Sequence, residues 1–171
     1  NTLFSTDATF DRRAFPQAGT RRLETFYRAA RSAPGLLADG RVPVGGAWNY
    51  DAENRRAWKG EPPAPATVAF APDATTREVM SLVATRYPAS LGSVDGFAWP
   101  VTAEHAARVA DDFFANRLAS FGPFEDAMAA GEPELFHSLL SAPLNLGLLD
   151  PLDLCRRADA AYRAGAVPLA S

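Results

Sequence analysis

The chain has 171 residues, of which 47% are hydrophobic and 22% charged, a composition typical of one soluble globular domain. No apolar run is long enough to cross a membrane and no secretory pattern is visible, so we expect a cytoplasmic protein without a membrane partner. One cysteine and two histidines exclude an internal disulfide and an ordinary structural zinc site.

The net charge of -3 is unevenly distributed. Residues 1–60 carry ten basic and six acidic residues, whereas residues 61–171 carry seven basic and fourteen acidic ones. The densest basic cluster consists of Arg55, Arg56 and Lys59, and such a cluster can meet a phosphate backbone because electrostatic fields act locally. Solvated helix faces explain the same charges, and charge alone favours that simpler interpretation.

The first predicted element is a helix over "TRRLETFYRAAR", in which Leu23, Phe26, Tyr27 and Ala30 form one apolar stripe. Pro34 and Gly35 end it. Residues 36–74 follow as a long irregular segment, which contains "GGAWNYDAENRR" and a proline-rich stretch. In that motif we expect paired glycines to permit tight turns and the two aromatic rings to anchor the segment onto helices.

A second helix is predicted from Thr75, which would cap it together with Glu78. Its expected buried face comprises Val79, Leu82, Val83 and Tyr87.

A third helix is predicted after Thr102 and should end at Gly122. Its expected buried positions are Ala106, Val109, Ala110, Phe113 and Arg117 or Leu118. A short helix over "FEDAMAA" and a final helix from Asp150 to Gly165 complete the prediction. The expected fold class is therefore mainly α, with one long coil-rich segment.

No nucleotide-binding glycine loop, metalloprotease motif or serine elbow is present. We expect His105 to be solvated, Asp111 and Asp112 to form a solvated face, and Cys155 to be a buried, inert thiol. These residues therefore predict no catalytic group.

The stretch "FHSLLSAPLNLG" contains the strongest candidate site. His137, Ser138 and Ser141 interrupt an apolar segment at an expected helix start, where hydroxyls and free backbone N–H groups suit an anion such as phosphate. The alternative is that the two serines only cap turns.

Four segments in order resemble the bacterial photolyase-related proteins, the iron–sulfur branch of the cryptochrome/photolyase family that includes prokaryotic (6-4) photolyases. They are "GGAWNYDAENRR", "FAWPVT", "FGPFEDAM" and "FHSLLSAPLNLGLLDPLDLC". The resemblance implies that residues 1–18 end an α/β antenna domain, that residues 19–74 form a helix and an interdomain connection, and that residues 75–171 begin the helical FAD-binding domain. The absence of a starting methionine and the abrupt end fit a middle fragment of a longer protein.

The resemblance also implies an FAD site. Ser138 and Ser141 match phosphate-binding hydroxyls, Leu139 and Leu140 match backbone amide donors, and His137 replaces a threonine. Phe124 matches an aromatic residue that packs on the flavin nucleotide, and Asn145 is a further polar contact.

By the same resemblance, the parent protein would be a light-driven DNA repair enzyme, a carbon–carbon lyase that moves an electron from reduced flavin to a flipped-out pyrimidine lesion. The alternatives are a blue-light photoreceptor that binds FAD without efficient repair, and a helical interaction module with no cofactor. Arg55, Arg56 and Lys59 would touch the phosphates of damaged DNA.

The family's 4Fe-4S cluster needs four thiolates, and Cys155 corresponds to none of them. Those ligands and the ribityllumazine antenna site are expected outside this chain. Trp48, Trp58 and Trp99 are interpreted as packing residues. We expect a monomer, and little or no catalysis from residues 1–171 alone.

Overall fold

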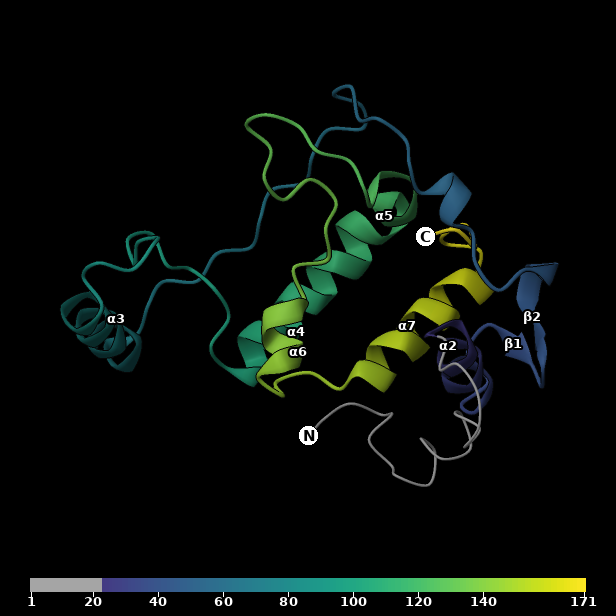
Figure 1. The fold of residues 1–171 in the computed structure, drawn as a ribbon, viewed down its shortest axis with the longest axis horizontal. Helices are drawn as coiled ribbons and strands as arrows, with labels where there is room; N and C mark the ends of the chain where they lie inside the picture. The colour runs from purple at the N-terminus through teal and green to yellow at the C-terminus, as the bar shows by residue number, and fades with distance from the viewer. Residues whose placement is uncertain (1–22) are drawn as a thin grey trace.

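The computed structural model describes residues 23–171, which are mainly helical and so confirm the predicted fold class (Figure 1). The predicted end of an antenna domain, residues 1–18, lies outside the described residues. The helices are α2 (Leu23–Ser32), α3 (Ala74–Arg86), α4 (Ala103–Asp112), α5 (Leu118–Phe124), α6 (Ser141–Asn145) and α7 (Pro151–Arg163). The smaller elements are strands β1 (Ala38–Asp39) and β2 (Val42–Pro43), the 3-10 turns η1 (Val44–Gly46) and η2 (Asp51–Glu53), and the π turn η3 (Phe113–Arg117).

A continuous rod of α4, η3 and α5 forms the centre of the fold (Figure 1). Thr102 caps it as predicted, because its hydroxyl accepts the His105 N–H at 3.2 Å. The predicted inward positions of this rod are buried: Ala106, Val109, Ala110, Phe113, Arg117 and Leu118.

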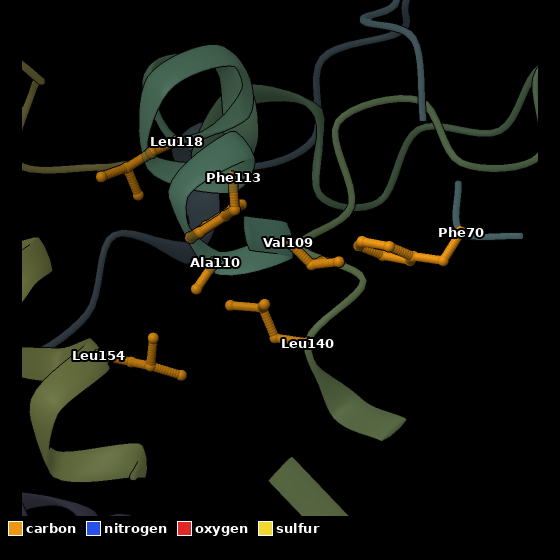
Figure 2. Close-up of a cluster of buried hydrophobic side chains, with 7 residues drawn as sticks. All are labelled: Phe70, Val109, Ala110, Phe113, Leu118, Leu140 and Leu154. Carbon is orange, nitrogen blue, oxygen red and sulfur yellow. The ribbon is translucent and has the colours of Figure 1, made fainter. Parts of the chain in front are cut away.

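The main core lies between this rod and segments that precede and follow it in the sequence (Figure 2). Phe70 comes from the coil-rich segment, Leu140 precedes α6, and Leu154 lies on α7. α7 begins as predicted, with Asp150 accepting the Leu152 N–H at 2.8 Å. The core therefore joins residues more than 80 positions apart into one unit.

The coil-rich segment contains only short regular elements and is held largely by individual hydrogen bonds. Strands β1 and β2 pair antiparallel as a small hairpin. Farther along, the Arg56 N–H donates to the Pro123 carbonyl at 3.0 Å, and the Phe70 N–H donates to the Ala98 carbonyl at 3.1 Å. These contacts satisfy backbone groups that have no sheet or long helix to pair with.

Two predictions for α3 are wrong. Its N-cap is Asp73, whose carboxylate accepts the Thr76 N–H at 2.7 Å, so Thr75 lies inside the first turn. The expected buried face is exposed, because α3 stands away from the central rod (Figure 1) and none of its residues is buried. Its apolar side chains at Val79, Leu82, Val83 and Tyr87 therefore meet no core.

Two predictions after α4 are also wrong. The helix runs past Gly122 to Phe124, with Pro123 inside it. Pro123 has no N–H to donate to the Ala119 carbonyl, which instead accepts a hydrogen bond from the Ser171 hydroxyl at 3.5 Å. No helix forms over "FEDAMAA". Phe124 and Ala127 instead pack in a second cluster with Leu135 and Phe136, and this burial outweighs the weak helix preference of so short a stretch.

Candidate functional site

The candidate site is an irregular run of residues 134–141 that leads into α6. Leu135 and Leu140 are buried and fix the two ends of the run in the two cores. Between them the backbone turns sharply, with Leu135 at φ 39° and Leu139 at φ 59°. Both values lie in the left-handed region, which a leucine rarely adopts.

The hydroxyl of Ser138 accepts the Leu140 N–H at 3.4 Å, a long bond within the run. Ser138 is half-buried, whereas Ser141 is exposed at the first position of α6. Residues 137–141 therefore form one continuous stretch that leads into α6, in which Leu140 is buried in the core and Ser138 and Ser141 carry hydroxyl groups. The structure also retains the turn-capping role that we considered for Ser138.

The other two predicted cofactor residues lie apart from this turn. Asn145 is exposed at the last position of α6. Phe124 stacks on Phe136, with ring centroids 5.2 Å apart. It therefore contacts the run at Phe136, the residue before His137. Figure 1 shows α5 and α6 toward opposite ends of the central rod.

Arg117 is the most connected side chain at this site, and its role was missed from the sequence. Its guanidinium is buried and pairs with Asp112, with Nε 3.2 Å from Oδ2. It also donates to the Leu135 carbonyl at 2.6 Å and to the Pro65 and Ala66 carbonyls at 3.1 Å. The available signal was an arginine at a position that the helical period predicts to be buried.

Asp112 therefore does not belong to a solvated face, as we expected from the sequence. Its carboxylate accepts hydrogen bonds from Arg117 and from Asn116. Asp111 is exposed, as predicted, and pairs with Arg157 at 2.7 Å.

A cavity of about 160 Å³ lies beside Arg117 and Asp112. Ser138, Leu139 and Trp99 form part of its wall. Ligand pockets usually enclose about 300–1,000 Å³, so this cavity is too small for a dinucleotide. Asp112 and Glu134 also line this cavity, so it is not by itself a site for an anion. A ligand at the Ser138 and Ser141 hydroxyls would be enclosed only in part by residues 23–171.

The basic cluster is exposed on the coil-rich segment, but acidic residues surround it. Arg55, Arg56 and Lys59 are all exposed. Asp126 lies 3.9 Å from the Arg55 Nε, and Glu125 accepts a hydrogen bond from Asn54 at 3.1 Å. The local positive charge is therefore smaller than the sequence cluster alone indicates.

The "GGAWNYDAENRR" segment is a structural clamp. The Trp48 carbonyl accepts hydrogen bonds from Tyr27 and Arg31 at 3.0 Å, and the guanidinium groups of Arg28 and Arg31 lie over the Trp48 ring. Gly45 has φ 78°, and a Cβ there would overlap the Tyr50 hydroxyl. The expected anchoring onto a helix is confirmed for Trp48, and the expected tight turn is confirmed at Gly45, whereas the Tyr50 ring is half-buried against Gly45.

Cys155 and His105 contribute no catalytic arrangement. Burial, followed by the charge of Asp150, raises the pKa of the Cys155 thiol, which agrees with an inert group. His105 is half-buried and stacks on Phe70 with ring centroids 4.1 Å apart, so the prediction of a solvated histidine is wrong. Within residues 23–171 no three His, Cys, Asp or Glu side chains cluster as a metal site, and no helix could span a membrane.

The described residues define a mainly helical protein with a long, ordered, coil-rich segment. A family described as deoxyribodipyrimidine photo-lyase-related protein matches residues 1–99. The chain belongs to this family. It is also similar to a protein of Agrobacterium fabrum (strain C58) named "(6-4) photolyase", with 44% identity over 147 residues. That alignment covers 86% of this chain but only 29% of the relative, so the chain spans less than a third of the relative's length.

Proposed function

We propose that this chain is part of a light-driven DNA repair enzyme of the (6-4) photolyase type. The observation that carries the proposal is the 44% identity to the Agrobacterium (6-4) photolyase across 86% of the chain. The activity would belong to the longer parent protein, as a carbon–carbon lyase.

We propose FAD as the cofactor, held in part by residues 137–141. The hydroxyls of Ser138 and Ser141 suit an anionic pyrophosphate, and the 3.4 Å bond from Leu140 to Ser138 is long enough to be exchanged for a ligand contact. Asn145 and Phe124 would contribute a polar contact and a packing surface. A reduced flavin supplies the electron for the repair chemistry, so the task of these residues is to bind and orient it.

Damaged DNA is the proposed partner, and Arg55, Arg56 and Lys59 are proposed to contact its phosphates. Their exposure supports this role, whereas the pairing of Arg55 with Asp126 reduces the positive charge that Arg55 can offer to DNA. Alanine at all three positions in the full-length protein should make the slope of log binding constant against log salt concentration shallower. The expected change corresponds to the loss of about two phosphate contacts. Arg86→Ala on α3 is the matched control, and an unchanged salt slope in the triple variant would exclude these contacts.

The decisive experiment is a repair assay on the full-length parent. The reduced protein is incubated with DNA that contains a defined (6-4) lesion, in the dark and under blue light. We expect loss of the lesion only in the light. A protein that binds flavin but leaves the lesion intact under light would be the photoreceptor alternative.

The purified chain of residues 1–171 gives a second test. Because its residues form only one edge of the proposed site, we expect little retained flavin and almost no absorption near about 450 nm. A flavin band of one equivalent would show that the site is complete within this chain. If the full-length protein also binds no flavin, the third alternative, a helical interaction module, holds instead.

A further inference from the structure

Arg117 joins three segments that are distant in the sequence. Its side chain is only 1% exposed, and it bonds to the coil-rich segment at Pro65 and Ala66, to α4 at Asp112, and to the candidate run at Leu135. A buried cation is tolerated only when it is paired and hydrogen-bonded, and Arg117 meets both conditions. The contacts therefore fix the relative positions of all three segments.

The π turn η3 explains how an arginine reaches this position. The Leu118 N–H donates to the Phe113 carbonyl, five residues earlier, so the turn is wider than an α-helical one. It allows Phe113, Arg117 and Leu118 all to be buried. Such turns often occur at functional sites.

The run that Arg117 contacts is strained. Leu135 and Leu139 have positive φ, and such residues persist only where the surrounding structure over-determines them. The 2.6 Å bond from Arg117 Nη1 to the Leu135 carbonyl is a charge-assisted bond at the first of these two residues. The second residue, Leu139, lies next to Ser138.

We propose that Arg117 is a positioning residue for the flavin site. By holding the backbone at Leu135, it keeps the strained run in one arrangement, in which the Ser138 hydroxyl and the following amides are presented to the ligand. This inference rests on the proposed function, since it takes FAD as the ligand. In this role Arg117 acts through the backbone, because its guanidinium is bound to Asp112 and to the carbonyls of residues 65, 66 and 135.

The test uses the full-length protein with the variant Arg117→Lys, which keeps the charge but loses the planar fork that reaches several carbonyls at once. FAD affinity is measured by flavin fluorescence during titration of the flavin-free protein. We expect about tenfold weaker binding, the change that loss of one charged hydrogen bond corresponds to. Asp112→Asn, which removes the paired charge with little change of shape, should weaken binding in the same direction but less.

Thermal unfolding with and without FAD distinguishes the positioning role of Arg117 from a purely structural role. At a fixed FAD concentration, the stabilisation by bound ligand grows with the logarithm of its affinity, so a positioning role predicts a smaller FAD-induced rise of the unfolding midpoint in the Arg117→Lys protein. The matched control is Arg157→Ala, which removes an arginine that pairs with Asp111 and stacks on Phe114 without contacting the run. That control should bind FAD as the wild type does.

The outcomes separate the inference from the function on which it rests. If the wild type binds FAD and both Arg117→Lys and Asp112→Asn bind it within twofold of the wild type, the positioning role is wrong and the proposed function stands. The same conclusion follows if their unfolding midpoints fall equally with and without FAD. If the wild type binds no FAD, the proposed function fails, and the inference fails with it.

Discussion

At the scale of single residues, Gly122 shows how closely two segments approach. It lies inside α5, and a Cβ at this position would overlap the backbone carbonyl of Ala170. The neighbouring Ser171 hydroxyl donates to the Ala119 carbonyl on the same helix. A glycine inside a helix costs about 1 kcal/mol relative to alanine, so this position is explained by the contact and not by helix formation.

We therefore expect Gly122→Ala to destabilise the chain, although alanine is the better helix former. Overpacking against a backbone group costs about 1–3 kcal/mol, which outweighs the gain in helix propensity. The urea midpoint of residues 1–171 measures the change, and Ser120→Ala on the same helix is the control. A Gly122→Ala protein that is more stable than the wild type would show that the 168–171 segment does not lie on α5 in solution.

At the scale of elements, the sequence predicted most features that local chemistry determines, although it placed the cap of α3 at Thr75 and not at Asp73. The caps at Thr102 and Asp150 and the inward positions of α4 follow from residues within one or two turns of each other. The neighbours of α3 and of "FEDAMAA" are set by distant segments, which no local pattern encodes. For the same reason the helical period predicted burial of Arg117 or Leu118, whereas the carbonyl partners of Arg117 at residues 65, 66 and 135 were not foreseen.

Residues 137–141 could be proposed as a site from the sequence because they form a single stretch, and their role stays a prediction. The position of Phe124 against Phe136 could not, because it depends on where the chain turns after Pro123. The carboxylates beside Arg55 likewise come from residues 125 and 126, about seventy positions away.

The N-cap of α3 gives a prediction at this scale. Hydrogen bonds from the backbone N–H and the hydroxyl of Thr76 lower the pKa of Asp73. The folded pKa lies below the ordinary value, so the stabilisation is complete above the ordinary pKa and is lost as pH falls through the folded pKa. Asp73→Ala should therefore speed amide exchange in the first turn of α3 near neutral pH, whereas Asp73→Asn, which still caps, should not.

The pH dependence of the protection factor at Thr76 checks the mechanism. Between about pH 6 and about pH 3 it should fall in the wild type and stay constant in Asp73→Asn. Equal curves for the two proteins would mean that the carboxylate charge contributes nothing to the cap.

At the scale of the whole molecule, two groups of apolar side chains differ in their burial. One group, drawn in Figure 2, packs between the central rod, α7 and the coil-rich segment. The other lies on α3, which stands apart from that core (Figure 1) and leaves Leu82 55% exposed. Helix formation in α3 therefore depends on its cap and its own sequence, whereas helix formation in α4 is supported by burial.

Replacing a leucine by alanine in each group tests whether burial stabilises α5 but not α3. In residues 1–171, Leu118→Ala removes a side chain that is 4% exposed, and it should cost about 2–5 kcal/mol in free energy of unfolding. Leu82→Ala removes the same atoms from an exposed position and should change that free energy by less than about 0.5 kcal/mol. Denaturant unfolding followed by fluorescence and by circular dichroism measures both variants. A cost at Leu82 comparable to that at Leu118 would mean that the α3 face is covered in solution, and sedimentation of the wild type would then distinguish cover by a second copy from a rearrangement within one chain.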